Sequence, residues 1–563
     1  MIGVGAVRFA AVVGAVSVWG GTVLACYGRF VGPRPVRPDW DYGMGRFDIS
    51  RIDAEPVYFG VVALAVGLWV GVVAVALARR GWNEGDEYAR RDWGVLFAVL
   101  AGIVVLPAMA LIRDAAAVVQ TLQAVRPLTI TVPVIVAGCV LIVAGSILLL
   151  PAALAPAALA PLRGRGLVVP LVAAVSVPVL AAGLAVRAGD DARGIDLRTV
   201  AAVAVPPVPA GLGIERYEVW LGNPGRVYPA DVVVAGAGFV VANSGGITAY
   251  HGGSGEELWH YRRTQREGGI GVQPGSLRSL DGGVVLAYWE YRGWTALDAL
   301  TGELLWQVSD FTRDHPDPQS PERRGRGFGL PEPLFRTEDD VLVSYDSRTG
   351  ARRWSARAVD PDCPGARSWF DTTTSTVYQA FRCLDPDELR VSALSGRDGS
   401  ITRTYVIPRP VGKDIPMTHR SGERVAAEWG ENTVLLDGAH DPQPLPGAQR
   451  VLAADAEGVL LRQRAGVEYI ARDARWVSED AEVRTALYWY YGLLGEYVAA
   501  IEQTDPGTVL RTWRRADGSP GPVVPVEVRG GRCPEGGLVP SPEMLTIPGG
   551  LLIRCGGWLL GYS

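Results

Sequence analysis

Long apolar runs dominate the first third of the chain. Five of them precede residue 188, and each has roughly the ~20 residues that a helix needs to cross ~30 Å of hydrocarbon. They are Phe9–Tyr27, Val57–Ala78, Trp93–Ile112, Ile130–Leu150 and Leu167–Val186. None has an acidic or basic residue in its middle, which favours an anchor over a pump or ion-coupled transporter. The pattern predicts an all-α transmembrane bundle of five helices over residues 1–187.

From residue 213 onward the pattern changes to short alternating segments. They are rich in valine and bounded by Gly-Gly or Asp-Gly, which is typical of strands and hairpins. The stretch "TALDALTGELLWQV" (Thr295–Val308) recurs in varied form, and its glycine falls at positions 255, 302, 350 and 399, spaced by 47, 48 and 49 residues. A period in this range predicts a propeller or a solenoid. Helical spacing is missing, so the sequence predicts an all-β propeller over residues 213–563 and a linker over residues 188–212.

The recurring glycine and tryptophan have separate structural roles. Glycine can adopt a positive φ in the turn between the last two strands of a sheet. Tryptophan on the outer strand can fill the wedge between neighbouring sheets. We therefore predict that these residues pack the blades together and perform no chemistry. The predicted blade-packing residues are Trp220, Trp259, Gly302, Trp306, Gly350, Trp354 and Trp513.

The two ends of this region indicate how the ring closes. The last stretch, "MLTIPGGLLIRCGGWLLGYS", supplies three short strands, and then the chain stops. The fourth strand is found far upstream as "ERYEVWLG", where Trp220 holds the position of the blade tryptophan. Pairing the first strand with the last sheet would remove exposed sheet edges. This count predicts eight blades, with seven as the alternative because residues 419–480 are degenerate.

The repeat "LDALTGELLW" resembles that of quinoprotein-type β-propellers, called PQQ-like repeats. This family includes barrel-assembly lipoproteins of Gram-negative outer membranes and quinoprotein dehydrogenases, and the resemblance covers residues 213–563. It implies either of two functions. One is a non-catalytic, membrane-anchored binding or scaffolding platform. The alternative is a membrane-bound dehydrogenase that uses PQQ and calcium and passes electrons to quinone.

The residues favour the platform over the dehydrogenase. Quinoprotein alcohol dehydrogenases often carry two adjacent cysteines over the PQQ, and no Cys-Cys occurs in this sequence. Asn223, Asn243 and Asn432 are the asparagines of the propeller region, and none stands in a recognisable calcium context. The five histidines show no ligand spacing, and neither a Walker loop nor a G-x-S-x-G elbow is found. We therefore expect no cofactor, no metal and no catalytic residue, with sensing or transport as further alternatives.

Charge and arginine placement bear on partners and location. The formal net charge of −5 disfavours a nucleic-acid partner. Lys413 is the one lysine of the chain, which is typical of a high-GC genome and suggests an actinobacterium. Arg8 and the arginines of residues 79–91 and 163–165 place their loops in the cytoplasm by the positive-inside rule. Five arginines in the first loop, spread among acidic residues, favour the opposite orientation.

This orientation predicts a multi-pass cytoplasmic membrane protein whose C-terminal propeller is extracytoplasmic. The expected partners are membrane lipid and other envelope or membrane proteins. "VLAC", ending at Cys26, resembles a lipobox and leaves lipidation of that cysteine as an alternative to a buried membrane cysteine.

Four of the six cysteines lie in the propeller region and form two similar pairs. They are Cys363 with Cys383 and Cys533 with Cys555, each about twenty residues apart. In both pairs the second cysteine ends a strand, so antiparallel neighbours within one blade could bring the two sulfurs within disulfide reach. Stable disulfides require an oxidising compartment, in agreement with the arginine argument. The alternative is a tetrathiolate zinc site, although C-x-x-C spacing is absent.

Overall fold

The structure is a computed structural model. It describes residues 4–27, most helical residues between 134 and 148, residues 168–188 and, from residue 195 on, the strands with part of their connections. The longer gaps after residue 195 are 222–230, 264–273, 309–333, 358–367, 409–416, 479–490 and 528–542. The chain divides into two compact units, Met1–Ile195 with Gln265–Ile270, and Asp196–Thr264 with Gly271–Ser563.

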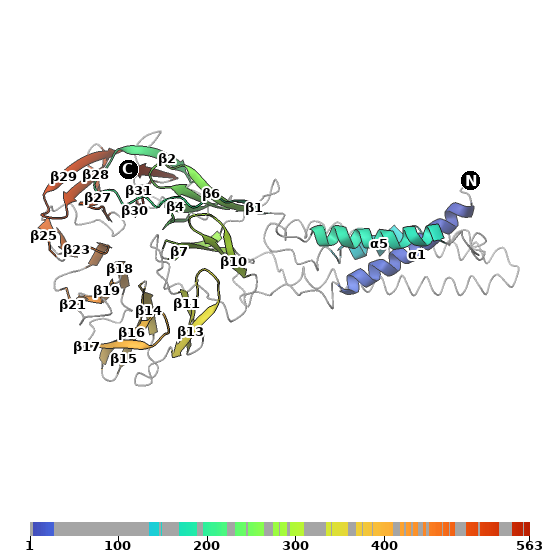
Figure 1. The fold of residues 1–563 in the computed structure, drawn as a ribbon, viewed down its shortest axis with the longest axis horizontal. Helices are drawn as coiled ribbons and strands as arrows, with labels where there is room; N and C mark the ends of the chain where they lie inside the picture. Colours follow the sequence, from blue (N-terminus) through green and yellow to red (C-terminus); the bar gives the residue numbers. More distant parts are fainter. Residues whose placement is uncertain are drawn as a thin grey trace. The chain divides into compact units, whose positions relative to one another are not determined.

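The first unit contains the helices α1 (Val4–Cys26) and α5 (Val168–Ala188), which pack against each other (Figure 1). Glycine permits the close approach. A methyl group at Gly20 would lie 2.6 Å from Cγ of Pro178 on α5. One at Gly145, in a further helical segment, would lie 2.6 Å from the carbonyl oxygen of Gly14. The helices therefore meet along backbone surfaces that leave no room for a side chain at these positions.

The prediction of five membrane-spanning helices is wrong. In the part of the chain that the structure describes, no helix has both the length and the apolar character needed to cross a membrane. α1 and α5 consist largely of glycine, alanine and valine, and α5 also contains Pro178. The multi-pass membrane localisation with an extracytoplasmic propeller rested on those spans and is wrong with them. The runs Val57–Ala78 and Trp93–Ile112 lie outside the described residues.

The second unit is a β-propeller whose described strands form eight antiparallel sheets. Sheet 1 consists of β3 (Asp231–Ala235), β4 (Gly238–Asn243), β5 (Gly246–His251) and β6 (Glu257–Arg263), with β1 (Ile195–Arg198) outside β6. Sheet 2 consists of β7 (Pro274–Leu280), β8 (Val284–Trp289), β9 (Gly293–Asp298) and β10 (Leu304–Val308). Sheet 3 consists of β11 (Leu334–Glu338), β12 (Val341–Tyr345) and β13 (Arg352–Arg357). Sheet 4 consists of β14 (Ser368–Thr372), β15 (Thr376–Leu384), β16 (Asp387–Ser395) and β17 (Ile401–Pro408).

The remaining sheets complete the ring (Figure 1). Sheet 5 consists of β18 (Met417–Ser421), β19 (Arg424–Trp429), β20 (Asn432–Leu436) and β21 (Gln443–Pro444). Sheet 6 consists of β22 (Arg450–Ala454), β23 (Gly458–Gln463), β24 (Gly466–Ala471) and β25 (Arg475–Ser478). Sheet 7 consists of β26 (Tyr491–Leu493), β27 (Tyr497–Thr504), β28 (Gly507–Arg514) and β29 (Pro520–Val526). Sheet 8 consists of β30 (Glu543–Ile547), β31 (Gly550–Cys555), β32 (Trp558–Tyr562) and β2 (Glu215–Trp220).

The prediction of eight blades is wrong as well, because the sheets do not form eight equivalent units. Among the described residues, six sheets have four strands, sheet 1 has five and sheet 3 has three. Sheet 1 gains its fifth strand because β1, from the predicted linker, pairs with β6. In sheet 3 the residues that precede β11 lie outside the described part of the chain.

Ring closure by the first strand of the propeller is confirmed. β2 pairs antiparallel with β32, with Val219 opposite Leu559 and Trp220 opposite Trp558. Figure 1 shows β2 beside the C-terminal strands. Sheet 8 is therefore built from the two ends of the propeller, and its outer strand comes from the N-terminal end.

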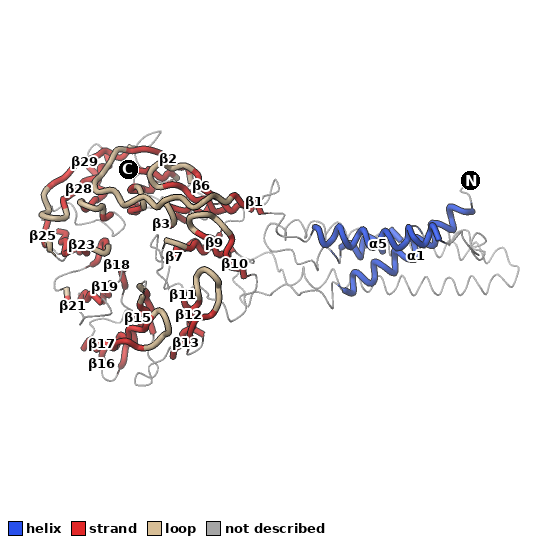
Figure 2. The backbone as a smooth tube through the Cα atoms, in the orientation of Figure 1, coloured by secondary structure: helices blue, strands red, loops and turns tan. Residues whose placement is uncertain are grey.

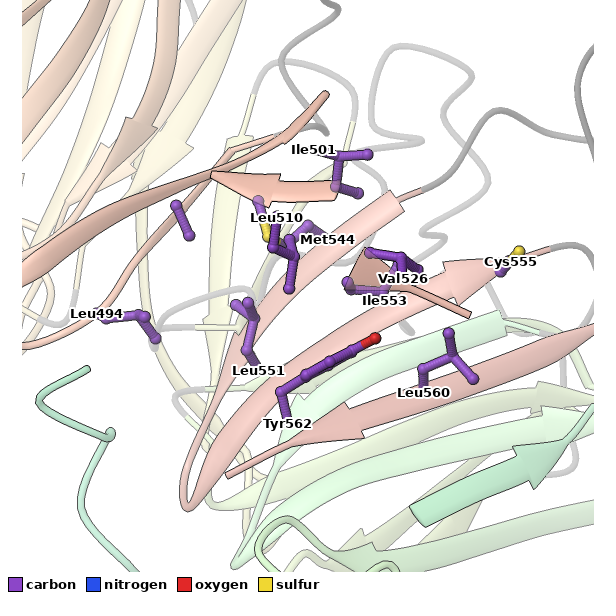
Figure 3. Close-up of a cluster of buried hydrophobic side chains, with 11 residues drawn as sticks. Leu494, Ile501, Leu510, Val526, Met544, Leu551, Ile553, Cys555, Leu560 and Tyr562 are labelled. Carbon is purple, nitrogen blue, oxygen red and sulfur yellow. The ribbon is translucent and has the colours of Figure 1, made fainter. Parts of the chain in front are cut away.

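The core lies between neighbouring sheets. Strands near the ring centre are covered on both faces, so their sequences are almost continuously apolar, as in "GLLIRC" of β31. Figure 3 shows one cluster, to which sheet 7 contributes Leu494, Ile501 and Leu510. Sheet 8 contributes Ile553 and Tyr562, each at most 1% exposed. Each buried leucine or isoleucine contributes about 2 kcal/mol of transfer free energy, so the stability of each sheet depends on its neighbour.

Candidate functional site

Neighbouring sheets meet through an aromatic residue of one sheet, on the outermost strand or, in sheet 1, on β6 next to it, and a turn of the next. Trp259 on β6 donates from Nε1 to the carbonyl oxygen of Ala299 at 2.9 Å, in the turn between β9 and β10. The same contact recurs at other junctions: Trp306 to Ser347 (2.8 Å), Trp354 to Gly396 (2.9 Å), Trp476 to Arg515 (3.0 Å) and Tyr217 to Gly252 (2.7 Å). Burial of Tyr217 also raises the pKa of its phenol.

Each accepting turn contains a glycine three residues after the acceptor. The φ values are 69° at Gly255, 75° at Gly302, 69° at Gly350, 73° at Gly399 and 72° at Gly518. The ring of the neighbouring sheet lies directly against this glycine: a methyl group at Gly302 would lie 2.7 Å from Cγ of Trp259. Backbone conformation and space thus both require glycine at this position.

An acidic residue shapes the turn of sheet 2. Oδ1 of Asp298 accepts hydrogen bonds from the backbone N–H groups of Leu300 and Thr301 at 2.9 and 3.0 Å. Its Oδ2 lies 2.6 Å from Nη2 of Arg348, which belongs to the equivalent turn of sheet 3. Partial burial alone would raise the pKa of Asp298, but the hydrogen bonds from Arg348 and from the turn hold that pKa below its usual value.

Arg515 joins sheet 7 to sheet 6. Its guanidinium is largely buried and donates to the Oη of Tyr469 at 2.7 Å, the carbonyl oxygen of Leu494 at 2.9 Å and Oδ1 of Asp455 at 2.8 Å. It also lies over the Tyr469 ring, 5.1 Å from the centroid. Burial disfavours the charged form, yet the hydrogen bonds to Asp455 and Tyr469 outweigh it, and the pKa of Arg515 is raised.

The predicted packing residues occupy different positions in this scheme. Trp259, Trp306 and Trp354, with Gly302 and Gly350, lie at the junctions. Trp220 is 51% exposed and packs against Trp558 in a tilted arrangement, at 4.6 Å between ring centroids, whereas Tyr217 makes the junction contact of β2. Trp513 is buried on β28, the third strand of its sheet, in the cluster that sheets 6 and 7 share.

The sequence reading missed Tyr217, Trp476 and Gly518 at the junctions. Tyr217 escaped because Trp220, three residues later, matches the repeat better by residue type. Trp476 and Gly518 belong to "YIARDARWV" and "WRRADGSPGP", which match the repeat only in part. Aligning the turns on their glycines would have revealed both residues.

Residues 199–214, which we call the strap, were also missed because the sequence reading assigned most of them to a linker. The strap leads from β1 to β2 and has no helix or strand of its own (Figure 2). From Val200 to Pro209 its partly buried residues recur at every third position: Val200, Val203, Pro206 and Pro209, and residues 211–213 are all partly buried. Three residues per turn is the period of a polyproline II helix, which "VPPVP" favours. The three closely spaced prolines were the available signal.

The strap contacts turns of three sheets. Its Val200 N–H donates to the carbonyl oxygen of Thr301 in sheet 2 at 3.0 Å. The carbonyl oxygen of Pro207 accepts from Gly549 in sheet 8 at 3.0 Å, and that of Pro209 from Gly495 in sheet 7 at 2.9 Å. That of Ala210 accepts from Glu496 in sheet 7 at 2.7 Å. These turns follow a first or a third strand, and because antiparallel strands alternate in direction, they share one face of the propeller, which we call the turn face.

β1 is attached to β6 beside a cluster of charged residues. His260 is 8% exposed, with Nδ1 at 2.6 Å from Oε1 of Glu257 and Nε2 at 3.3 Å from Oδ2 of Asp196 on β1. Oε2 of Glu257 pairs with Arg262 at 2.6 Å. Partial burial alone would raise the pKa of Glu257, but the hydrogen bonds from His260 and Arg262 outweigh that effect and lower the pKa. The cluster holds the start of the strap against sheet 1.

Cysteine placement is partly described. Cys26 and Cys139 have free thiols. Cys383 and Cys555 are disulfide-bonded, while Cys363 and Cys533 lie outside the described residues, so the two predicted pairings stay predictions. Among the described residues, no three His, Cys, Asp or Glu side chains are placed to hold a metal ion.

Comparison with known proteins supports the class of the fold. The family model described as outer membrane protein assembly factor BamB matches residues 224–316 and 243–435. The second unit is thus a β-propeller with repeats of the PQQ-like type. No curated protein matches the chain at a significant level.

Solved structures resemble the propeller at low identity. BamB from Moraxella catarrhalis has a TM-score of 0.37 and 14% identity, covering 62% of this chain and 100% of its own. The dihydro-heme d1 dehydrogenase NirN has a TM-score of 0.35 and 13% identity, covering 63% and 85%. The WD40 domain of SCAP from fission yeast has a TM-score of 0.32 and 11% identity, covering 65% and 98%. Similarity at this level carries no argument about function.

Proposed function

We propose that this chain is a non-catalytic β-propeller that binds other proteins through its turn face. The match to the BamB family model over residues 224–316 and 243–435 carries the proposal, because that model describes an assembly factor. The geometry supports it. The recurring tryptophan and glycine of the repeat pack the junctions. The outer side chains of the turns differ from sheet to sheet, and they are exposed and polar.

The turn of sheet 4 illustrates what a partner would meet. Gly396 is buried as the acceptor for Trp354, while Arg397 and Asp398 next to it are exposed. The corresponding turn of sheet 3 exposes Arg348 and Thr349. Packing thus fixes the backbone of each turn and leaves its outer side chains available for recognition.

Site-specific photocrosslinking in the native host tests the proposal. A photoreactive residue at Arg397 should yield a discrete adduct with another protein. The matched control is Val523 on the outer strand β29, which is 52% exposed but lies away from the turns. Adducts of the same mass and yield at both positions, or none at Arg397 and at other exposed turn residues, would contradict a specific turn-face interface.

We further propose that Cys383 pairs with Cys363 and Cys555 with Cys533. Ser368, the first residue of β14, pairs with Phe381, two residues before Cys383. Glu543, the first residue of β30, pairs with Arg554, next to Cys555. The first described strand after each upstream cysteine therefore begins beside the downstream cysteine. Peptide mapping by mass spectrometry without reduction should recover these two linked pairs and no peptide that links Cys383 to Cys533.

A further inference from the structure

The strap is held to the propeller mainly through its backbone. Three carbonyl groups, those of Pro207, Pro209 and Ala210, accept hydrogen bonds from N–H groups of propeller turns. The prolines have no N–H group, so this stretch acts chiefly as an acceptor. Recognition through backbone carbonyls depends on the extended conformation and little on side-chain identity.

Few strap side chains are buried. Val205 and Val208 are 53% and 43% exposed, and Leu212 packs against the cluster between sheets 7 and 8. By contrast, Val219 on the adjoining strand β2 is 9% exposed and belongs to a core cluster. A segment with little buried apolar surface opens at a lower free-energy cost than the core. The strap is therefore easier to detach than the strand that follows it.

The residues under the strap form a surface of defined chemistry, which we call the strap seat: Gly495, Glu496, Tyr497 and Gly549. It offers three backbone N–H donors, from Gly495, Glu496 and Gly549. A methyl group at Gly549 would lie 2.9 Å from Cγ of Pro206, and one at Gly211 would lie 3.4 Å from the Tyr497 ring. The seat thus combines backbone donors with an aromatic ring and close contact to proline, the features that recognise an extended proline-rich chain.

We propose that the strap seat is a peptide-binding site that the strap occupies in cis, and that an extended, proline-rich segment of a partner protein competes for it. The strap itself defines the ligand: an apolar stretch in which every third residue from Val200 to Pro209 is partly buried, with prolines that keep the backbone extended. This inference rests on the proposed binding function and names the chemistry of one partner segment. The attached strap lowers the apparent affinity for the partner by the fraction of time that it covers the seat.

A labelled peptide provides the test. Its sequence is that of residues 200–214, and its binding to the full chain is followed by fluorescence anisotropy. Replacing Pro206 and Pro209 of the chain together by glycine loosens the strap, because glycine restores the freedom that proline removes. This variant should bind the peptide about tenfold more tightly than the unaltered chain. A peptide of the same composition, with prolines moved out of the three-residue spacing, should not bind.

Variants of the seat locate the peptide. In the loosened-strap chain, Gly495→Pro removes the N–H that meets Pro209 and should abolish binding. Ala456→Pro is the matched control, since Ala456 holds the equivalent position in the sheet 6 turn and binding should persist. Gly495→Ala keeps the N–H but places a methyl group 3.1 Å from Cα of Ala210, so it should weaken binding about tenfold even where the proline variant fails to fold.

Two results would overturn the inference: a loosened-strap chain that binds the peptide no better than the unaltered one, or binding unaffected by both Gly495 substitutions. Crosslinking at Arg397 and peptide binding at Gly495 distinguish a failure of this inference from a failure of the proposed binding function. If crosslinks form at Arg397 while the peptide never binds, the turn face binds a protein and the strap seat is not its site. If the peptide binds at Gly495 without crosslinks at Arg397, the seat is a binding site and the interface does not extend to sheet 4.

Discussion

The junction between Trp259 and Gly302 allows a quantitative test of how the sheets are held together. Gly302→Ala introduces two costs. The φ of 75° is unfavourable for alanine and costs about 1 kcal/mol. The added methyl group would lie 2.7 Å from the indole of Trp259, which is 0% exposed and cannot move without disturbing its hydrogen bond to Ala299. Overpacking of this kind costs about 2 kcal/mol, so we expect a total loss of about 3 kcal/mol.

Gly282→Ala separates the two costs. Gly282 has nearly the same backbone conformation, with φ of 67°, but a methyl group there meets nothing within 4 Å. This variant should lose about 1 kcal/mol, from backbone strain alone. Urea unfolding followed by tryptophan fluorescence gives both changes in the free energy of unfolding. Equal losses would refute the conclusion that the ring presses against the turn and would leave the glycine with a conformational role only.

Three further substitutions probe the other junctions. Tyr217→Phe keeps the ring but removes the hydrogen bond to Gly252, and should lower the free energy of unfolding by about 1 kcal/mol in the same urea assay; no change would mean that the bond is replaced by solvent. Arg515→Met leaves carboxylate and tyrosine partners without their donor and should cost about 3 kcal/mol; a loss below about 0.5 kcal/mol would show that the cluster is not stabilising. Arg348→Ala should cost at most about 1 kcal/mol at pH 7, since the arginine is more than half exposed. Because the pKa of Asp298 is lowered in the folded state, its stabilisation is full above the unfolded pKa and is lost as pH falls through the folded pKa. The Arg348 variant should therefore lose less stability than the unaltered chain between pH 7 and pH 3, and an equal loss would contradict the pairing.

The propeller could be predicted because its packing rule is local in sequence. Trp259 and Gly302 belong to one repeated phrase, and their period reports the sheet-to-sheet spacing directly. Closure by β2 followed from counting strands at the C-terminus. The identity of the closing aromatic did not follow, because register decides that Tyr217, and not Trp220, faces sheet 1. Register depends on pairing with β32, which lies at the other end of the chain.

The strap and the helices show where residue patterns mislead. A search for periods of two and 3.6 finds neither in residues 199–214, which are apolar at almost every position, so they looked like linker; the period of three is one of burial and appears only in the structure. In α1 and α5, valine, alanine and glycine gave runs of membrane length. Run length alone did not establish a membrane span, since no described helix has both the length and the apolar character needed. The candidate binding site was missed because it is made of turn backbone, which no residue type marks.

Closure by β2 has a consequence for biosynthesis. Arg216 on that strand meets Ser563, its partner 347 residues later, so the outer strand of sheet 8 leaves the ribosome long before the strands that it completes. Until β30, β31 and β32 have been synthesised, β2 has no partner strand in sheet 8. Contacts of such long sequence separation form slowly and leave partly folded chains prone to aggregation. Loss of β32 should therefore leave β2 without a partner and uncover one edge of β31.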